Sequence, residues 1–174
     1  LNDTFLHTTT YNGFGEESVT ALESLNIISE VKFKNQVELL SSLLSKKLIE
    51  LKDKYKNKIE IIKGNGILNG IIFKSYSTAL AKLVETIPLK FIKDKSFFLK
   101  KLTATAISCE LYEKYGILTS INDAAGSNHL CVSPSLIINE ENVAYFFNSL
   151  EKVLQTNLNL KSLEVIFNFL KSKS

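Results

Sequence analysis

Residues 58–74 read KIEIIKGNGILNGIIFK, in which two apolar runs flank a short segment that contains glycine and asparagine. The runs at 58–62 and 67–74 predict two β-strands, because both are rich in isoleucine. Asn65-Gly66 between them predicts a tight hairpin turn, since type I′ geometry needs a positive φ that glycine adopts freely. The stretch therefore predicts an antiparallel hairpin.

The glycines of this stretch do not form a nucleotide-binding motif. Gly64, Gly66 and Gly70 have a spacing that differs from the dinucleotide-binding pattern, and a hairpin surrounds them where that pattern needs a strand-to-helix turn. We therefore predict a structural role for them, in a tight turn and in a close contact between strands, and no catalytic role.

Helical periodicity appears on both sides of the hairpin. Apolar residues recur at steps of three and four positions, which is typical of amphipathic helices. We expect helices that begin near Gly15 and run to about 28, and others at 32–56, 77–88, 95–115, 140–154 and 160–172, with further short strands at 117–121 and 128–133. This order predicts an α+β fold, in which a small, largely antiparallel sheet has helices packed on one face.

Helix-capping signals support two of these boundaries. Asn139 is a good N-cap for the helix that follows, and Glu140 and Glu141 fill its first turn, where acidic side chains suit the helix dipole. Gly116 stands where a C-cap glycine would end the helix at 95–115.

Composition excludes several functional classes. The chain has 174 residues, 21 basic against 18 acidic, and no methionine. The basic residues are mixed with acidic and apolar ones, so we expect no nucleic-acid partner. No apolar run approaches the roughly 18–20 residues of a membrane span, so we expect no membrane partner.

The two cysteines fit a cytoplasmic protein. The absence of an initiating methionine suggests proteolysis or a cut from a longer polypeptide.

The predicted strand at 128–133 carries chemically reactive side chains on one face. His129, Cys131 and Ser133 alternate with Leu130 and Val132, so the first three face one side of the strand and the other two face the opposite side. The apolar pair predicts the side that is buried.

Neither a metal site nor a nucleophilic triad is predicted. His129 and Cys131 are two soft ligands, but a zinc site usually needs three or four, and only His7 and Cys109 remain in the chain. Both histidines lie on distant segments without a serine elbow, which leaves no Ser-His-Asp set.

Three threonines precede the first expected helix, at Thr8, Thr9 and Thr10. Hydroxyls next to free backbone N–H groups suit a phosphate group, because each donates a hydrogen bond to it. From the residues alone, an ordinary polar loop is the simpler alternative.

Three short segments together resemble one family. The segments are HTTTY at 7–11, KGNGILNG at 63–70 and VSPSLII at 132–138, and in this order they resemble the last part of a class III aminotransferase, a pyridoxal-phosphate enzyme of fold type I. The resemblance implies that the chain starts just after the cofactor lysine. It also implies that 1–30 is the last loop and helix of a large cofactor-binding domain and 31–174 is the C-terminal small domain.

The resemblance also suggests roles for individual residues. It implies that Thr9 and Thr10 reach across a dimer to the phosphate of the partner subunit's cofactor, although the usual Gly-Gly-Asn-Pro is replaced by 12–15, NGFG. Lys63 stands where the family commonly has an arginine. Cys131 stands where the family commonly has the arginine that binds the substrate carboxylate. Substrate-binding residues therefore stay unassigned, and no catalytic residue is expected in this chain.

The leading hypothesis is a C-terminal fragment of an aminotransferase that transfers an amino group between an amine, including an ω-amine, and a keto acid or aldehyde. Its implied partners are pyridoxal phosphate, the rest of the same polypeptide and a second copy in a homodimer. Two alternatives remain open: a non-catalytic dimerisation or partner-binding module derived from this fold, and an unrelated α+β domain. The chain alone would not be an enzyme under the leading hypothesis.

Overall fold

The computed structural model describes residues 15–74, 82, 95–122 and 128–171. The chain divides into two compact units, Leu1–Leu39 and Leu40–Ser174, which we describe separately. A search of the described residues found no helix with the length and hydropathy that a membrane crossing requires.

The first unit contains helix α1 (Glu16–Ser29) and the start of helix α2 (Val31–Lys54). Glu16 and Glu17 occupy the first turn of α1, where their charge suits the helix dipole. No residue of α1 is buried. Its apolar side chains are exposed: Val19, Leu22 and Leu25 keep 72%, 64% and 55% of their surface in solvent.

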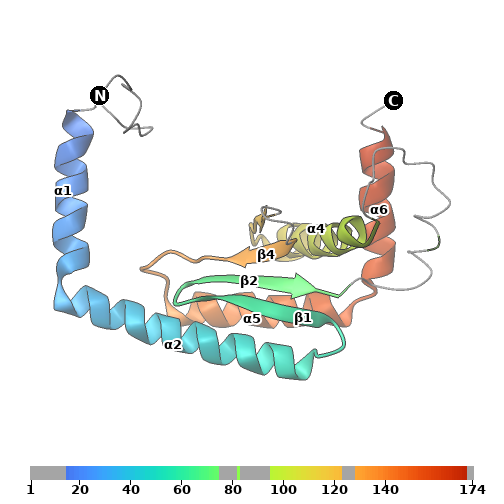
Figure 1. Cartoon of the computed structure of the whole chain (residues 1–174), viewed down its shortest axis with the longest axis horizontal. Helices are drawn as coiled ribbons and strands as arrows, with labels where there is room; N and C mark the ends of the chain where they lie inside the picture. The colour runs from blue at the N-terminus through green and yellow to red at the C-terminus, as the bar shows by residue number, and fades with distance from the viewer. Residues whose placement is uncertain (1–14, 75–81, 83–94, 123–127, 172–174) are drawn as a thin grey trace, which may run out of the picture. The chain divides into compact units, whose positions relative to one another are not determined.

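The second unit is built on a four-stranded sheet whose order is β1-β2-β4-β3. The strands are β1 (Ile59–Asn65), β2 (Leu68–Phe73), β3 (Ile121–Asn122) and β4 (His129–Val132). Every neighbouring pair is antiparallel, which confirms the predicted sheet type. Figure 1 shows β1, β2 and β4 side by side, with α5 running along the sheet.

One hydrophobic core joins the sheet to three helices, which confirms the predicted α+β arrangement. The helices are the part of α2 after Leu39, α4 (Lys95–Tyr115) and α5 (Glu140–Gln155), and the first residue of α6 (Leu158–Lys171) joins them. The members of the core with 1% exposure or less are Leu44, Leu48, Ile59, Ile71, Phe73, Ala104, Ile107, Leu111, Leu130, Leu150, Val153, Leu154 and Leu158. Burial of each large aliphatic side chain contributes roughly 1.5–3 kcal/mol.

The hairpin forms, but its loop lies one residue later than predicted. Asn65 pairs with Leu68, so the two-residue loop is Gly66-Ile67 and not Asn65-Gly66. Gly66 has φ +65° and Gly64 has φ +116°, both of which favour glycine. The Asn65 side chain accepts a hydrogen bond from the backbone N–H of Gly66 at 2.8 Å, which stabilises the turn.

Two other predicted elements differ from the structure or lie outside it. The strand predicted at 117–121 is reduced to the two residues of β3, and 116–120 has no regular structure. The backbone N–H of Cys131 still donates to the carbonyl of Ser120 at 2.8 Å, which ties this segment to β4. The helix predicted at 77–88 falls outside the described residues, apart from Lys82, which is helical.

The predicted helix caps are confirmed. Asn139 is the N-cap of α5, and its side chain accepts a hydrogen bond from the N–H of Asn142 at 2.8 Å. Gly116 ends α4 with φ +65°, and its N–H donates to the carbonyl of Tyr112 at 3.0 Å. This is a left-handed C-cap, which redirects the chain toward β3.

Helix α6 (Leu158–Lys171) packs against α4 through a small apolar contact and an ion-pair cluster. The Nζ of Lys161 lies 2.5 Å from Glu113 of α4 and 3.0 Å from Glu164. Burial lowers the pKa of Lys161, but hydrogen bonds to the two carboxylates outweigh it, so the pKa is raised overall. Burial also raises the pKa of the nearby Cys109 thiol, which favours its neutral form.

Candidate functional site

The two residues predicted to contact a cofactor phosphate lie outside the described part of the chain. Thr9 and Thr10 belong to 1–14, and the whole segment at 7–11 falls there too. Their role toward the phosphate therefore stays a prediction based on sequence.

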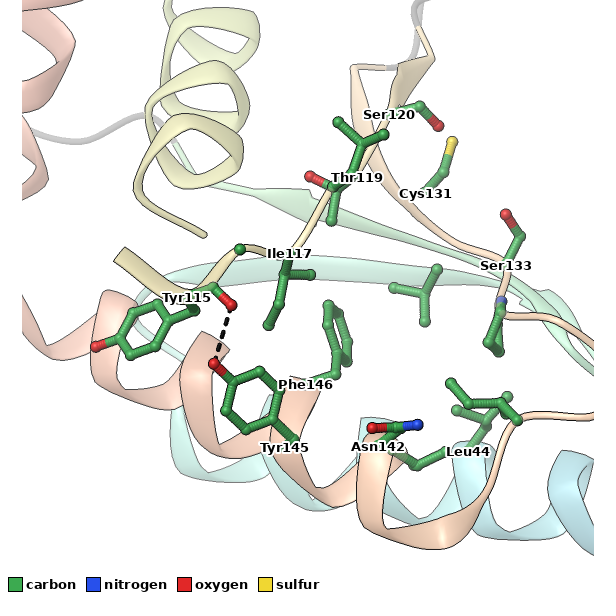
Figure 2. Close-up of a pocket in the computed structure, with 16 residues that line it drawn as sticks. Leu44, Tyr115, Ile117, Thr119, Ser120, Cys131, Ser133, Asn142, Tyr145 and Phe146 are labelled. Carbon is green, nitrogen blue, oxygen red and sulfur yellow. Dashed lines mark hydrogen bonds between the residues drawn. The ribbon is translucent and has the colours of Figure 1, made fainter. Parts of the chain in front are cut away.

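Strand β4 places its polar side chains on the face of the sheet away from the core. Leu130 and Val132 are 0% and 5% exposed and belong to the core, whereas His129 and Cys131 are half-buried on the other face. This alternation is the one that the sequence predicted. Figure 2 shows the thiol of Cys131 pointing away from the interior, where Phe146 lies. The Cys131 thiol is free.

The register of the sheet aligns three residues in one row across this face. Lys63 of β1 is paired with Gly70 of β2, and Gly70 is paired with Cys131 of β4. Residues directly opposite each other on antiparallel strands point to the same face of the sheet. The side chains of Lys63 and Cys131 therefore share a face, with a glycine between them.

The imidazole of His129 occupies the space above Gly70. A Cβ atom at Gly70 would lie 2.5 Å from His129 Cδ2 and 3.0 Å from its Cγ, closer than van der Waals contact permits. Glycine at this position thus lets the ring lie against the backbone of β2. The sequence predicted a close contact between strands here, and the structure shows that the close partner is a side chain.

A shallow cavity of about 260 Å³ lies over this row. Its lining residues come from β1, β2 and β4 and from the residue after β4, and none of them is acidic: Lys63, Gly64, Leu68, Asn69, Gly70, His129, Cys131 and Ser133. An ammonium, an amide, an imidazole and a hydroxyl are all able to donate hydrogen bonds. The chemistry of this lining suits a small oxyanion.

A larger cavity of about 690 Å³ lies between 115–120, the end of β4 and the start of α5. Its interior is largely apolar, with side chains that include Leu44, Ile117 and Phe146 (Figure 2). The hydroxyl of Tyr145 donates to the carbonyl of Tyr115 at 2.9 Å, which links α5 to the chain after α4. This cavity is suited to an apolar group and offers no basic side chain to an anion.

No local sequence pattern predicts the larger cavity, and local patterns predict the smaller one only in part. Thr119 and Ile117 line the larger one because β3 pairs with β4, a contact between segments that no local pattern specifies. The place of Lys63 opposite Gly70 follows from the length of the hairpin loop. Its alignment with Cys131 follows only from the β2–β4 pairing.

A search of the described residues found no cluster of three or more histidine, cysteine or acidic side chains that could hold a metal ion. His129 and Cys131 share a face, but Cys109 lies on α4 and His7 is outside the described part.

The family model for class III aminotransferases matches residues 2–154. The chain belongs to this family. The match spans both compact units and ends at the last turn of α5, so α6 lies beyond it. Class III aminotransferases depend on pyridoxal phosphate, so membership of the family brings that cofactor with it.

Known aminotransferases are similar to this chain over part of their length. The mitochondrial acetylornithine aminotransferase of Saccharomyces cerevisiae is 31% identical over 108 residues, which are 62% of this chain and 26% of that protein. A transaminase from the marine bacterium Virgibacillus superposes with a TM-score of 0.61 at 17% identity, over 94% of this chain and 32% of its own. A Bacillus anthracis aminotransferase superposes with a TM-score of 0.61 at 23% identity, over 87% of this chain and 30% of its own.

These relatives are much longer than this chain. The chain spans about a third or less of each of these relatives. The two structural matches show that the described fold is that of an aminotransferase.

Neither of these two cavities by itself forms a cofactor site. Pyridoxal phosphate needs donors for its phosphate and a lysine for its carbonyl carbon. The larger cavity has no basic residue among its lining, and the smaller one has only Lys63 and the imidazole of His129. Thr9 and Thr10, which the sequence predicted to bind the phosphate, lie outside the described part, and the cofactor is not placed in either cavity.

Proposed function

We propose that this chain is the C-terminal part of a transaminase, which transfers an amino group between an amine and a keto acid or aldehyde. The observation that supports this proposal most strongly is the family match over residues 2–154. In this proposal, 1–30 completes the large domain and 31–174 is the small domain. The active enzyme is a homodimer, in which Thr9 and Thr10 bind the phosphate of the partner subunit's cofactor.

The cofactor supplies the chemistry that a polypeptide lacks. When bound, pyridoxal phosphate withdraws electrons from the carbon that carries the transferred amino group. The contribution of this chain is to hold and shield the substrate. Ile117, Val143 and Phe146 give the larger cavity an apolar wall, which would keep water away from an apolar group bound there.

The identity of residue 131 favours one class of amine donor. An arginine at this position would hold a carboxylate by two charge-assisted hydrogen bonds, and Cys131 offers no such contact. A carboxylate without a partner in a dry pocket is costly to bury. We therefore propose that the donor is an ω-amine or another terminal amine, and not an α-amino acid.

The test compares the 174-residue chain with a longer polypeptide that carries it. Each is supplied with pyridoxal phosphate, a terminal amine and a keto acid, and the transfer of the amino group is followed by product analysis. We expect transfer by the longer polypeptide and none by the 174-residue chain, since the cofactor lysine is expected upstream of Leu1.

Two outcomes of this test would contradict the proposal. A longer polypeptide that binds the cofactor and transfers no amino group from any amine would support the alternative of a non-catalytic dimerisation module. A lysine within 1–174 that becomes covalently linked to the cofactor after borohydride reduction would show that the chain carries its own cofactor lysine.

A further inference from the structure

We propose that Lys63 binds the carboxylate of a substrate beside the His129 ring that covers Gly70, in the shallow cavity that Cys131 and Ser133 also line. This inference rests on the transaminase function proposed above and names the group that this face of the sheet recognises.

The register of the sheet places the cation over the cavity. Lys63 and Cys131 are both paired with Gly70, so they point to the same face across the three adjacent strands. Gly70 has no side chain of its own, and the His129 ring covers its backbone. The four-carbon stem of a lysine is flexible, so its ammonium is able to reach across this ring toward β4.

The neighbours of Lys63 along β1 confirm the direction in which it points. Ile62 packs against the hydrophobic core, and its partner Ile71 is fully buried there. Side chains alternate along a strand, so Lys63 points to the opposite face. Lys63 is exposed and lines the cavity, which leaves its ammonium accessible to a ligand.

The lining of the cavity is suited to an anion. None of its eight lining residues is acidic, and Lys63 supplies a positive charge. Ser133 adds a hydroxyl, and the His129 ring closes the floor above Gly70. A carboxylate is flat and small enough for a cavity of about 260 Å³, whereas the rest of a substrate would extend beyond it.

The position of the cation determines where the carboxylate lies. Neighbouring strands are about 4.8 Å apart, so Lys63 is anchored roughly 10 Å from the strand that carries Cys131. A carboxylate that Lys63 holds is therefore displaced from the place where an arginine at 131 would hold one. This displacement favours substrates whose carboxylate is several bonds away from the reacting amino or carbonyl group.

The experiment uses the complete enzyme and matched pairs of substrates. The donor pair is an ω-amino acid and the monoamine with the same carbon chain and no carboxylate; the acceptor pair is a keto acid and the matching aldehyde without one. KM is measured for all four with the wild type and with Lys63→Ala and Lys63→Arg. Lys47→Ala is the control, because Lys47 is an exposed lysine of α2 that pairs with Glu50.

We expect Lys63→Ala to raise KM about three- to tenfold for a carboxylate-bearing substrate and to leave KM unchanged for the matching substrate without a carboxylate. Lys63→Arg restores the wild-type KM, and Lys47→Ala changes KM for neither member of a pair. A rise for the ω-amino acid assigns the carboxylate to the donor, and a rise for the keto acid assigns it to the acceptor.

Three results would overturn the inference. In the first, Lys63→Ala leaves all four KM values unchanged. In the second, it raises KM equally for the charged and uncharged members of each pair. In the third, the wild-type enzyme transfers no amino group from any donor, which would contradict the proposed function together with the role of Lys63. The first two results contradict the role of Lys63 alone.

Discussion

The ring of His129 lies where a side chain at position 70 would have to be, with Cδ2 only 2.5 Å from the ideal Cβ position of Gly70. This relationship joins the hairpin of β1 and β2 to the strand that carries Cys131. It explains why a glycine stands in the middle of β2, where other residues would favour strand formation.

The first prediction tests this contact by a double-mutant cycle. Gly70→Ala pushes the ring of His129 away from the sheet, and we expect it to reduce the free energy of unfolding by about 1–3 kcal/mol. In a His129→Ala background the two closest atoms are absent, and only a contact at 3.3 Å to Cβ remains. The same substitution then costs less than about 1 kcal/mol. Urea denaturation of the four proteins provides the measurement.

Gly15→Ala is the control for this cycle, because nothing lies within 4 Å of a Cβ at that position. We expect it to leave the free energy of unfolding nearly unchanged. An equal cost of Gly70→Ala with and without the His129 ring would contradict the proposed contact.

The second prediction separates the two glycines of the hairpin that have positive φ. At Gly64, with φ +116°, a Cβ would lie 2.1 Å from the carbonyl oxygen of Leu68, a backbone atom that cannot move aside. At Gly66, with φ +65°, the nearest atom is the Ser41 hydroxyl at 3.9 Å. We expect Gly64→Ala to cost more than about 3 kcal/mol, and Gly66→Asn less than about 1 kcal/mol, because asparagine tolerates the left-handed region.

Thermal and urea unfolding of the two variants provide the comparison. If Gly64→Ala is no more costly than Gly66→Asn, the hairpin does not have the register that pairs Asn65 with Leu68.

The third prediction concerns Thr10, which lies outside the described residues. In the longer polypeptide, we expect Thr10→Ala to weaken retention of pyridoxal phosphate by about 10–150-fold, since a hydrogen bond to a charged group contributes roughly 1.5–3 kcal/mol. Equilibrium dialysis measures the loss of cofactor, and circular dichroism checks that folding is unchanged.

Mixing this variant with a variant that lacks the cofactor lysine tests whether Thr10 acts across the dimer. In a heterodimer, one site would carry both defects and the other neither, so activity returns on mixing. Heterodimers that form, as separate affinity tags would show, without any return of activity would place Thr10 in its own subunit's site.

Local patterns predicted those elements whose signals are local. The N-cap at Asn139 and the C-cap at Gly116 fix the ends of α5 and α4, because capping depends on residues within one turn. The alternation on β4 was predicted because its period is two and one face is apolar. The loop was misplaced by one residue because Asn65-Gly66 and Gly66-Ile67 both place a glycine in the turn.

The contacts that build the candidate site could not be predicted in this way. Strand β2 is paired with β4, which lies more than fifty residues later in the chain. That pairing brings Lys63 into line with Cys131. The short β3 also depends on pairing between strands, since its Ile121 pairs with Leu130. Residues 117–120 were predicted as strand but line the larger cavity, because their apolar content does not distinguish a strand from a cavity wall.

The most direct test of the central claim, that the outer face of β4 meets the substrate, is the donor preference of the complete enzyme and its Cys131→Arg variant. The ratio of kcat/KM for α-amino acids to kcat/KM for terminal amines is measured, with Cys131→Ala as the control that changes the thiol without adding charge. We predict that the wild type and Cys131→Ala prefer terminal amines, and that Cys131→Arg gains on α-amino acids because it restores a bidentate partner for the carboxylate. A wild-type preference for α-amino acids that Cys131→Arg leaves unchanged would contradict the claim.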